Sequence, residues 1–159
     1  MKFLRTIHLD ESDKKVFPSA SAPGELAVPG TFSFSNMEVG NMSSKEQLAF
    51  KNGWLGLASF GRCTLVQIVD VTEEVIDEAV GILADHFVIA FGAPDRETAL
   101  EAARAEVGDA VALCEQDPGT LLAIEREIVE DGISERIRIV KQAEPGQHAK
   151  IWTVVGDDE

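Results

Sequence analysis

Histidine and cysteine are the residues of this sequence that most readily bind metals or act as nucleophiles. The three histidines, His8, His86 and His148, lie far apart, and no His-x-x-x-His or Cys-x-x-Cys spacing occurs. Asp85 precedes His86, but neighbouring side chains of a helix point about 100° apart and cannot chelate one ion. Zinc sites usually draw ligands from such close spacings. We therefore expect no metal site, and we expect His86 to lie on a helix surface.

Cys63 follows Arg62 directly, and an adjacent cation favours the thiolate, the nucleophilic form of cysteine. A cysteine nucleophile also needs a general base and a group that orients this base, and the sequence assigns neither. The simpler interpretation is that Cys63 is a small core residue at the base of a strand and that Cys114 is buried on a helix. The sequence thus provides no catalytic residue and no cofactor-binding residue, and it argues against an enzyme without excluding one.

Residues 53–61, with the sequence GWLGLASFG, form the most unusual segment. The glycines do not match the spacing of dinucleotide-binding or phosphate-binding loops. One interpretation is a buried, tightly turned connection that leads into a central strand. The other is a pocket wall or an exposed apolar contact surface. For this second interpretation the candidate interface or pocket residues are Trp54, Leu55, Phe60, Arg62 and Cys63.

The charge of the chain is concentrated in one region. The 159 residues carry a formal net charge of −14, and residues 70–131 alone contain seventeen Asp or Glu and three Lys or Arg. Such a surface repels the phosphates of nucleic acids and anionic membranes, so we expect neither as a partner. The acidic stretch is either a solvated helix face or a docking surface for a basic protein partner.

The composition indicates one globular domain that spans residues 1–159. Apolar residues make up 45% of the chain, and this length can bury roughly two thirds of the unfolded surface. No apolar run approaches the roughly 20 residues of a membrane-spanning helix, and no signal peptide is recognisable. We therefore expect a cytoplasmic protein, with a flexible acidic tail at residues 156–159.

The first half of the sequence predicts strands and one short helix. An apolar and polar run at residues 3–9, with a restart at 16–17, predicts a hairpin. Residues 25–34 resemble strand material that Pro29-Gly30 should interrupt, and residues 31–35 alternate with both phenylalanines on one face. Ser43 and Glu46 fit a capping box, so a helix should span 44–52 and end at a left-handed Gly53.

The middle of the sequence predicts a central strand followed by two long helices. Residues 65–71 are almost wholly apolar, and Thr72 can cap a helix over 73–91 that Gly92 ends. A second helix should span 95–116, and the short link predicts antiparallel packing. The inner face of this second helix should consist of small apolar side chains, which are Ala99, Ala102, Ala103, Val107, Ala110, Val111 and Cys114.

The last part of the sequence predicts a β-hairpin and one edge strand. Asp131-Gly132 favours a two-residue type I′ turn between strands 120–130 and 133–141. This register places Glu127 opposite Arg136, Glu125 opposite Arg138 and Ile124 opposite Ile139, and it predicts that both isoleucines are buried. Ala149 to Val155 could add an edge strand. The order of elements predicts the α+β class, a mainly antiparallel sheet with a two-helix hairpin and a short helix packed on one face.

Four stretches resemble a small family of proteobacterial proteins of unknown function. They are residues 4–10 (LRTIHLD), 61–67 (GRCTLVQ), 91–95 (FGAPD) and 118–121 (PGTL), and the resemblance extends to about Lys141. No activity of the family can be transferred to a residue here. The resemblance implies an accessory role, associated with a bacterial redox (molybdenum) enzyme system of the formate dehydrogenase type.

Two functional hypotheses follow. The first is a noncatalytic accessory or protein-interaction protein with a protein partner or self-association, and without a cofactor. The second is a small-molecule-binding protein or enzyme with a pocket beside Trp54 to Cys63. A concave apolar site with convergent polar groups would favour the second, and an exposed apolar patch would favour the first.

Overall fold

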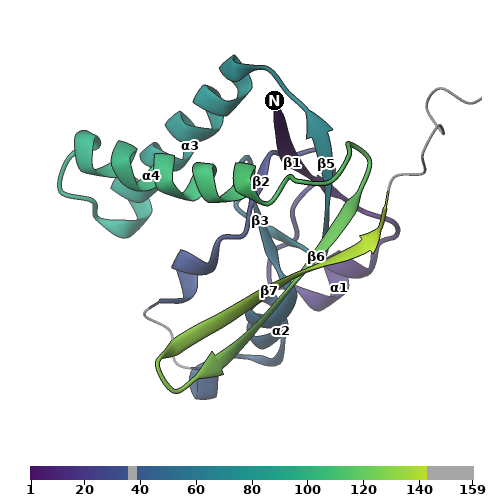
Figure 1. Cartoon of the computed structure of the whole chain (residues 1–159). Coiled ribbons are helices and arrows are strands. Elements are labelled where there is room, and N and C mark those ends of the chain that lie inside the picture. The colour runs from purple at the N-terminus through teal and green to yellow at the C-terminus, as the bar shows by residue number, and fades with distance from the viewer. Residues whose placement is uncertain (36–38, 143–159) are drawn as a thin grey trace, which may run out of the picture.

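The computed structural model describes residues 1–35 and 39–142, and its elements are shown in Figure 1. The predicted edge strand Ala149–Val155 and the tail 156–159 lie outside the described residues. Within them, one antiparallel sheet has the order β1-β5-β6-β7, with β1 at Lys2–Ile7, β5 at Leu65–Asp70, β6 at Leu121–Val129 and β7 at Gly132–Lys141. A second sheet has the order β2-β3-β4, with β2 at Ala27–Val28, β3 at Trp54–Gly56 and β4 at Arg62–Cys63.

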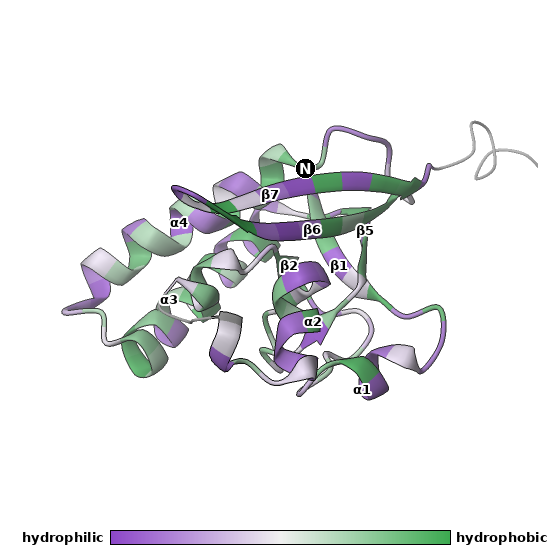
Figure 2. Ribbon diagram, turned by 90° about the horizontal axis from the view of Figure 1, so that it is seen from below, coloured by the Kyte–Doolittle hydropathy of each residue, from purple (hydrophilic) through white to green (hydrophobic). Residues whose placement is uncertain are grey.

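The α+β class and the mainly antiparallel sheet are confirmed. The α-helices are α1 (Ser12–Val16), α2 (Ser44–Asn52), α3 (Glu73–Phe91) and α4 (Arg96–Ala112), with short 3₁₀ helices at Thr31–Phe34 and Val39–Asn41. In Figure 2 the helices α1 and α2 lie on one side of the long β6–β7 ribbon, and α3 and α4 extend to one end of the molecule. None of the described helices is long and apolar enough to cross a membrane.

The predicted central strand is correct. β5 pairs with β1 on one side and with β6 on the other, so it is an interior strand of the sheet. Val66 and Ile68 are fully buried, and β1 contributes the buried Phe3 and Leu4 opposite this strand. The main core lies between this sheet, the second sheet and the two long helices.

Two predictions for the first 35 residues are wrong. The residues after β1 turn into α1 rather than into a hairpin, and the Asp10 carboxylate accepts a hydrogen bond from the Ser12 amide at 2.8 Å in the turn that precedes this helix. Residues 31–34 form a 3₁₀ helix instead of a strand, and Gly30 enters it with a left-handed φ of 74°. Phe32 and Phe34 therefore pack against different partners.

The helix predicted at 44–52 is confirmed together with its capping box. The Ser43 hydroxyl accepts from the Glu46 amide at 3.1 Å, and the Glu46 carboxylate accepts from the Ser43 amide at 2.9 Å. Gly53 ends the helix with a φ of −96°, so the predicted left-handed conformation is wrong. A glycine is needed there for space, because a Cβ at Gly53 would lie 2.7 Å from the Ala49 carbonyl oxygen.

Both ends of α3 agree with prediction. Thr72 accepts a hydrogen bond from the Val75 amide at 3.4 Å, and Gly92 ends the helix in the left-handed conformation with a φ of 66°. Asp95 caps α4 through the Thr98 amide at 2.7 Å, and α4 ends at Ala112, four residues before the predicted end. On the predicted inner face of α4, Ala99, Ala103, Val107 and Ala110 are buried, whereas Ala102 is exposed.

The β6–β7 hairpin exists, but its predicted register is wrong. Val129 pairs with Gly132, so Glu130 and Asp131 form the turn, and Ile124 lies opposite Ile137 instead of Ile139. A type I′ turn needs a positive φ at both central residues, and Phe60 is the one described non-glycine residue with a positive φ. Gly132 follows the turn with a φ of 142°, a positive value that favours glycine over other residues.

The shift of two residues keeps the same side chains on each face of the ribbon but changes their partners. Glu125 now lies opposite Arg136, and Glu127 lies opposite Ser134. Arg138 still reaches the Glu125 carboxylate at 3.5 Å as a diagonal neighbour. Ile124 is fully buried, but Ile139 is 45% exposed, so the prediction that both are buried is also wrong.

The packing of α4 leads to a stability prediction. Ala103 is fully buried where α4 meets α3 and the core, and extra methylene groups there have no free space. Ala103→Leu should lower the free energy of unfolding by about 1–3 kcal/mol through overpacking. Ala105→Leu, on the exposed side of the same helix, is the matched control and should change it by less than about 0.5 kcal/mol. Urea denaturation measures both, and equal effects would show that this face is not packed.

Candidate functional site

The structure brings the predicted candidate residues together inside the molecule, with one exception. Trp54 and Cys63 oppose each other in the second sheet, as do Leu55 and Arg62, and all four side chains are buried. Phe60 lies in the connection between β3 and β4 and keeps part of its surface exposed. The first interpretation of this segment, a tightly turned buried connection, therefore describes it better, with the addition that it forms two short strands.

Cys63 has the environment of a core thiol. Burial raises the pKa of this thiol to about 12, so it stays protonated at neutral pH despite the preceding arginine. Its Sγ donates to the Leu65 carbonyl oxygen at 3.2 Å. Cys114 is also buried, and both cysteines are free. Neither thiol has the thiolate character that a nucleophile requires.

The Arg62 side chain points into the interior and acts as a donor to the backbone. It donates to the carbonyl oxygens of Pro29 at 3.3 Å, of Gly53 at 3.1 Å and of Gly30 at 3.0 Å, and also to the Ser33 hydroxyl. Burial lowers the pKa of Arg62 to about 9, with a smaller effect from the nearby Arg126. The guanidinium thus remains charged at neutral pH.

Arg126, which sequence reasoning missed, is the second buried arginine. Its guanidinium donates to Phe50 O at 2.8 Å, Gly53 O at 3.0 Å and Ala49 O at 3.4 Å, and also to Pro29 O. Burial lowers the pKa of Arg126 to about 10. The partly exposed Glu135 carboxylate, 3.8 Å from Arg126 Nε, acts in the opposite direction and raises this pKa. A signal was present in the sequence, because Arg126 shares the alternation of Ile124 and Ile128 and should face the same side of the strand.

The two arginines share acceptors and one aromatic ring. Both donate to the carbonyls of Pro29 and Gly53, and the Phe34 ring lies 4.5 Å from the Arg62 guanidinium carbon and 5.3 Å from that of Arg126. The acceptors at the end of α2 carry the negative end of the helix dipole, which favours a cation there. These contacts occupy the donors of both side chains, so the arginine pair is a structural joint rather than a ligand site.

Glu25 fixes the loop that carries Phe60. Its carboxylate accepts from the amides of Ala22 at 2.6 Å, Ala58 at 3.0 Å and Ser59 at 2.9 Å, and from the Ser59 hydroxyl at 2.7 Å. Burial by itself would raise the pKa of Glu25, but these hydrogen bonds outweigh it, so the pKa lies below its usual value. Phe60 then follows with a φ of 55°, a strained conformation for a bulky residue.

The Phe60 ring rests on α3. It stacks on His86 with 3.7 Å between ring centroids and 8° between planes, and Phe91 meets the His86 ring edge-on at 5.4 Å. Partial burial lowers the pKa of His86, which favours the neutral imidazole. His86 thus lies on the surface of a helix, as predicted, but it is only partly exposed because Phe60 covers one face of its ring.

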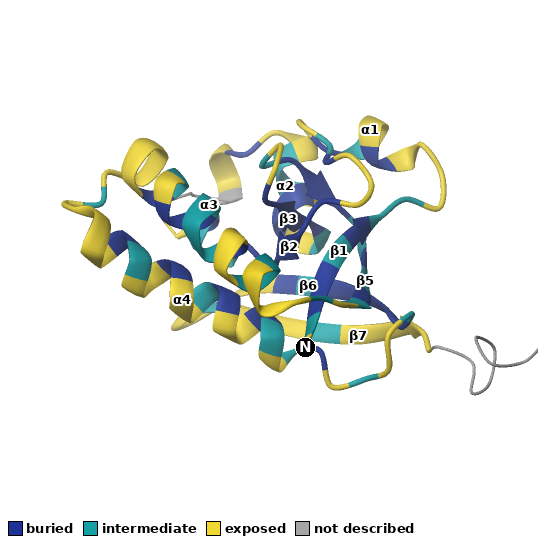
Figure 3. Ribbon diagram, turned by 90° about the horizontal axis from the view of Figure 1, so that it is seen from above, coloured by how far each residue is buried: buried dark blue, intermediate teal, exposed yellow. Residues whose placement is uncertain are grey.

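Exposed apolar side chains gather at the last turn of α3. Val88 is 38% exposed, Ile89 84% and Phe91 46%, and we name these three residues the apolar tip. Most of the outer surface of α3 and α4 in Figure 3 is exposed. Phe91 also contacts Phe32 and Phe87 edge-on, so the base of the tip is anchored in the core while its end faces water.

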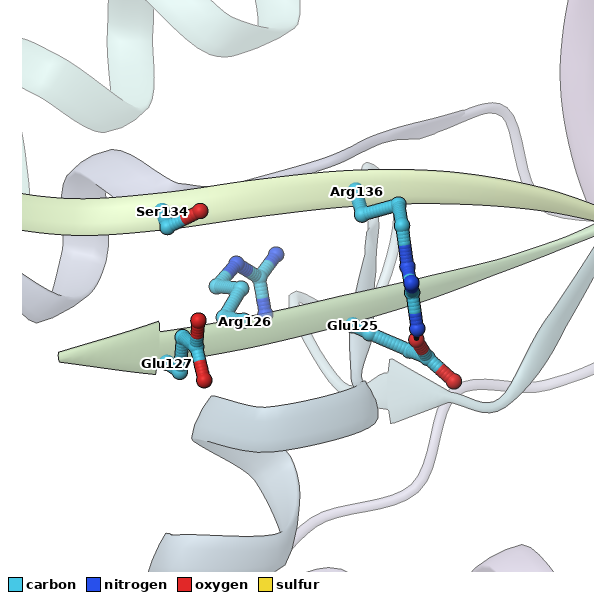
Figure 4. A pocket seen from close by; sticks show the side chains of 5 residues that line it. All are labelled: Glu125, Arg126, Glu127, Ser134 and Arg136. Carbon is cyan, nitrogen blue, oxygen red and sulfur yellow. Dashed lines mark hydrogen bonds and ion pairs between the residues drawn. The ribbon is translucent and has the colours of Figure 1, made fainter. Parts of the chain in front are cut away.

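A hollow of about 350 Å³ lies on the β6–β7 ribbon (Figure 4). It is lined by Glu125, Arg126, Glu127, Ser134 and Arg136, and Arg136 reaches across to the Glu125 carboxylate. Hydrogen bonds from Arg136 lower the pKa of Glu125, so this carboxyl is ionised at neutral pH and cannot serve as a proton donor. A general acid would need the opposite shift.

The histidines do not assemble a metal site in the described part of the chain. His8 lies 3.6 Å from the Asp13 carboxylate, which also accepts from the Thr64 hydroxyl at 2.9 Å. Across residues 1–35 and 39–142, no three His, Cys, Asp or Glu side chains lie close enough to hold one ion. His148 lies outside these residues.

The fold and these contacts define a small α+β protein whose buried polar groups are structural and whose distinctive surface is apolar and acidic. Comparison with known families identifies it further. The model of a family of unknown function, DUF6505, matches residues 1–155, and the chain belongs to this family. The expected membership in a family without an assigned activity is thereby confirmed. No curated protein and no solved structure matches the chain.

The arginine joint leads to a prediction about stability. Arg126→Met keeps much of the apolar volume but removes the donor to the Phe50 carbonyl and one of the two arginine donors to the carbonyls of Gly53 and Pro29, so unfolding should become easier by about 2–4 kcal/mol. Arg138→Met, on the exposed side of the ribbon, is the control and should cost less than about 1 kcal/mol. Urea denaturation compares the two variants, and equal stabilities would contradict a structural role of Arg126.

Glu25 leads to a prediction about pH. Because its folded pKa lies below the ordinary value of 4.5, its ionised form stabilises the protein fully above that value, and the contribution is lost as pH falls through the folded pKa. Glu25→Gln should thus be less stable than the wild type by about 1–3 kcal/mol near neutral pH, with a shrinking difference below about pH 4. Denaturation curves across this range measure it, and a difference independent of pH would contradict the assignment.

Proposed function

We propose that this chain is a noncatalytic, cytoplasmic accessory protein that binds a protein partner through the apolar tip of α3. The observation that carries the proposal is the exposure of Val88, Ile89 and Phe91 within four successive residues. Full burial of one such side chain contributes about 1.5–3 kcal/mol. A contiguous apolar surface surrounded by polar residues is typical of an interaction site.

Charge around the tip favours a basic partner. Asp85, Asp95 and Glu97 are exposed near the link between α3 and α4, and most of the remaining charge of both helices is acidic. An apolar centre with a charged rim is the usual anatomy of a protein interface. The complementary surface would carry an apolar centre surrounded by lysine or arginine, and opposite charges would also speed the encounter.

Rigidity of the surroundings also supports this proposal. The tip stands on an aromatic base in which Phe60 stacks on His86, and the Phe60 loop is fixed by Glu25 through three hydrogen bonds. Side chains that are already ordered lose less conformational entropy when a partner binds. The strained φ of Phe60 is consistent with a position that the surrounding structure holds in place.

The second hypothesis, a pocket beside Trp54 to Cys63, has weaker support in this geometry. Trp54, Leu55 and Cys63 are each at most 3% exposed, and Arg62 is 7% exposed with both terminal nitrogens hydrogen-bonded inside the protein. A hollow of about 260 Å³ touches this segment at Leu57 and Ala58, but none of the five candidate residues lines it. Association with a molybdenum enzyme stays a prediction from the resemblance, because no described residue bears on it.

The tip can be tested with a matched pair of charge substitutions. The tagged chain is used to capture partners from the cytoplasm of its own cells, and mass spectrometry identifies them. Ile89→Asp should lower the affinity for a genuine partner at least about tenfold, since it places a charge in the apolar centre. Ile128→Asp is the control, because Ile128 is similarly apolar and 55% exposed but lies on β6.

Association rates measured at several salt concentrations test whether the partner is basic. Reversal of Glu97, Glu101 and Asp109 to lysine should slow association with the captured partner at low salt and flatten its salt dependence. Stability should barely change, because exposed charges contribute little. A partner that binds the wild type, Ile89→Asp and Ile128→Asp equally well would refute the proposed site. An unchanged association rate of the triple variant would show that the acidic face is only solvated.

A further inference from the structure

A second surface of the helical hairpin, separate from the apolar tip, is hollowed and partly apolar. A hollow of about 580 Å³ runs along the outer side between α3 and α4. Its apolar lining comprises Ile76, Val80, Leu100, Val107 and Val111. Four of these five side chains are only half-buried, so they pack against the core on one side and leave apolar surface open to the hollow on the other.

Two glycines open this hollow. Gly81 of α3 and Gly108 of α4 both line it, and a Cβ added at either position would meet nothing within 4 Å. Glycine in a helix interior costs about 0.5–1 kcal/mol relative to alanine. Without side chains at these positions, the backbone of both helices is accessible to a packing helix, as it is where small residues permit close helix contacts.

The charges at this hollow differ from those of the surrounding surface. Residues 70–131 contain only three basic residues, and Arg126 is buried. The other two, Arg96 and Arg104, both line the hollow together with Asp77. Arg96 pairs with Asp85 across the two helices, whereas Arg104 and Asp77 make no ion pair within the described residues. The strip is therefore nearly neutral, on a strongly acidic part of the chain.

Asp77 and Arg104 lie at the same level of the hairpin. Asp85 and Arg96 meet near the link between the helices, and Asp77 precedes Asp85 by eight residues while Arg104 follows Arg96 by eight. Since the chain returns along α4, each of the two lies about 12 Å from the Asp85–Arg96 pair. The α3 side of the hollow thus carries the carboxylate of Asp77, and the α4 side carries the guanidinium of Arg104 at the same level along the helices.

We propose that this hollow is the interface of a symmetric dimer, in which α3 of one copy packs against α4 of the other. A two-fold axis along the hollow places Asp77 of each copy over Arg104 of its partner and brings the two apolar strips together. The same surface then serves on both copies, as an isologous contact requires. The result is a bundle of four helices, the two hairpins facing each other.

Charge complementarity favours a second copy of this chain as the molecule that packs against the hollow. A chain with a net charge of −14 repels itself over most of its surface, and this strip is where an acid and a base stand opposite each other without a partner. A basic helix would meet two arginines at this strip. A helix with only acidic side chains would leave Asp77 without a cation. A copy of this chain offers both charges at matching positions.

The test uses the full chain and two charge reversals. Light scattering after size exclusion, and sedimentation equilibrium over a range of concentrations, should give twice the monomer mass for the wild type. Asp77→Arg and Arg104→Asp should each raise the dissociation constant of the dimer at least about tenfold, because every symmetric contact then joins like charges. Mixing the two variants in equal amounts should restore a dimer, since both contacts in the mixed pair join opposite charges. The double variant Asp77→Arg/Arg104→Asp should also dimerise.

Control variants separate this proposal from a general effect of charge and from the function proposed for the tip. Asp109→Arg, on α4 but outside the hollow, should leave the dimer unchanged, and all variants should keep the wild-type circular dichroism. A wild type that stays monomeric throughout, or a mixture of the two reversals that stays monomeric, would overturn the proposal. Partner binding at the apolar tip is measured independently through Ile89→Asp, so either proposal can fail without the other.

Discussion

Two buried arginines hold the interior of this protein together. Arg62 and Arg126 join β4 and β6 to the end of α2 and to the chain around Pro29, because both donate to the carbonyls of Pro29 and Gly53. A guanidinium removed from water is costly unless its donors are satisfied, so each of these segments is held where it can supply an acceptor. The close approach of the chain at Gly30 and Gly53, where a Cβ would collide with neighbouring atoms, follows from the same requirement.

This joint explains why the most unusual segment of the sequence is structural. The small sheet made by β2, β3 and β4 is short, and such a sheet has little stability of its own. Its strands are held by the arginine contacts on one side and by the Glu25 carboxylate on the other. The charged groups here are directed mainly at the backbone. The surface proposed to bind a partner lies at the periphery, where α3 and α4 carry the acidic charge and exposed apolar side chains.

Local patterns identified most elements, and long-range contacts changed several of them. The capping box of α2, the Thr72 cap and the Gly92 end of α3 depend on neighbours within four residues, so the sequence identifies them directly. The predictions of a hairpin at the start and of a strand at 31–35 are wrong, because a turn at Asp10 leads into a short helix and because Phe32 and Phe34 pack in different clusters. The β6–β7 register differs by two residues, which leaves the faces unchanged and so escapes detection by alternation.

The sequence by itself determined the α+β class, the order of the main elements, the acidic charge of the helical hairpin and the inner alanine face of α4. Each of these is encoded in periodicity or composition, which act along the chain. Only the tertiary structure decided that Arg62 and Arg126 meet, that Cys63 is a protonated core thiol, and that Phe60 lies on His86. It also decided that Arg96 and Arg104 line one hollow with Asp77. These features depend on residues tens of positions apart, whose proximity arises from packing and leaves no local pattern in the sequence.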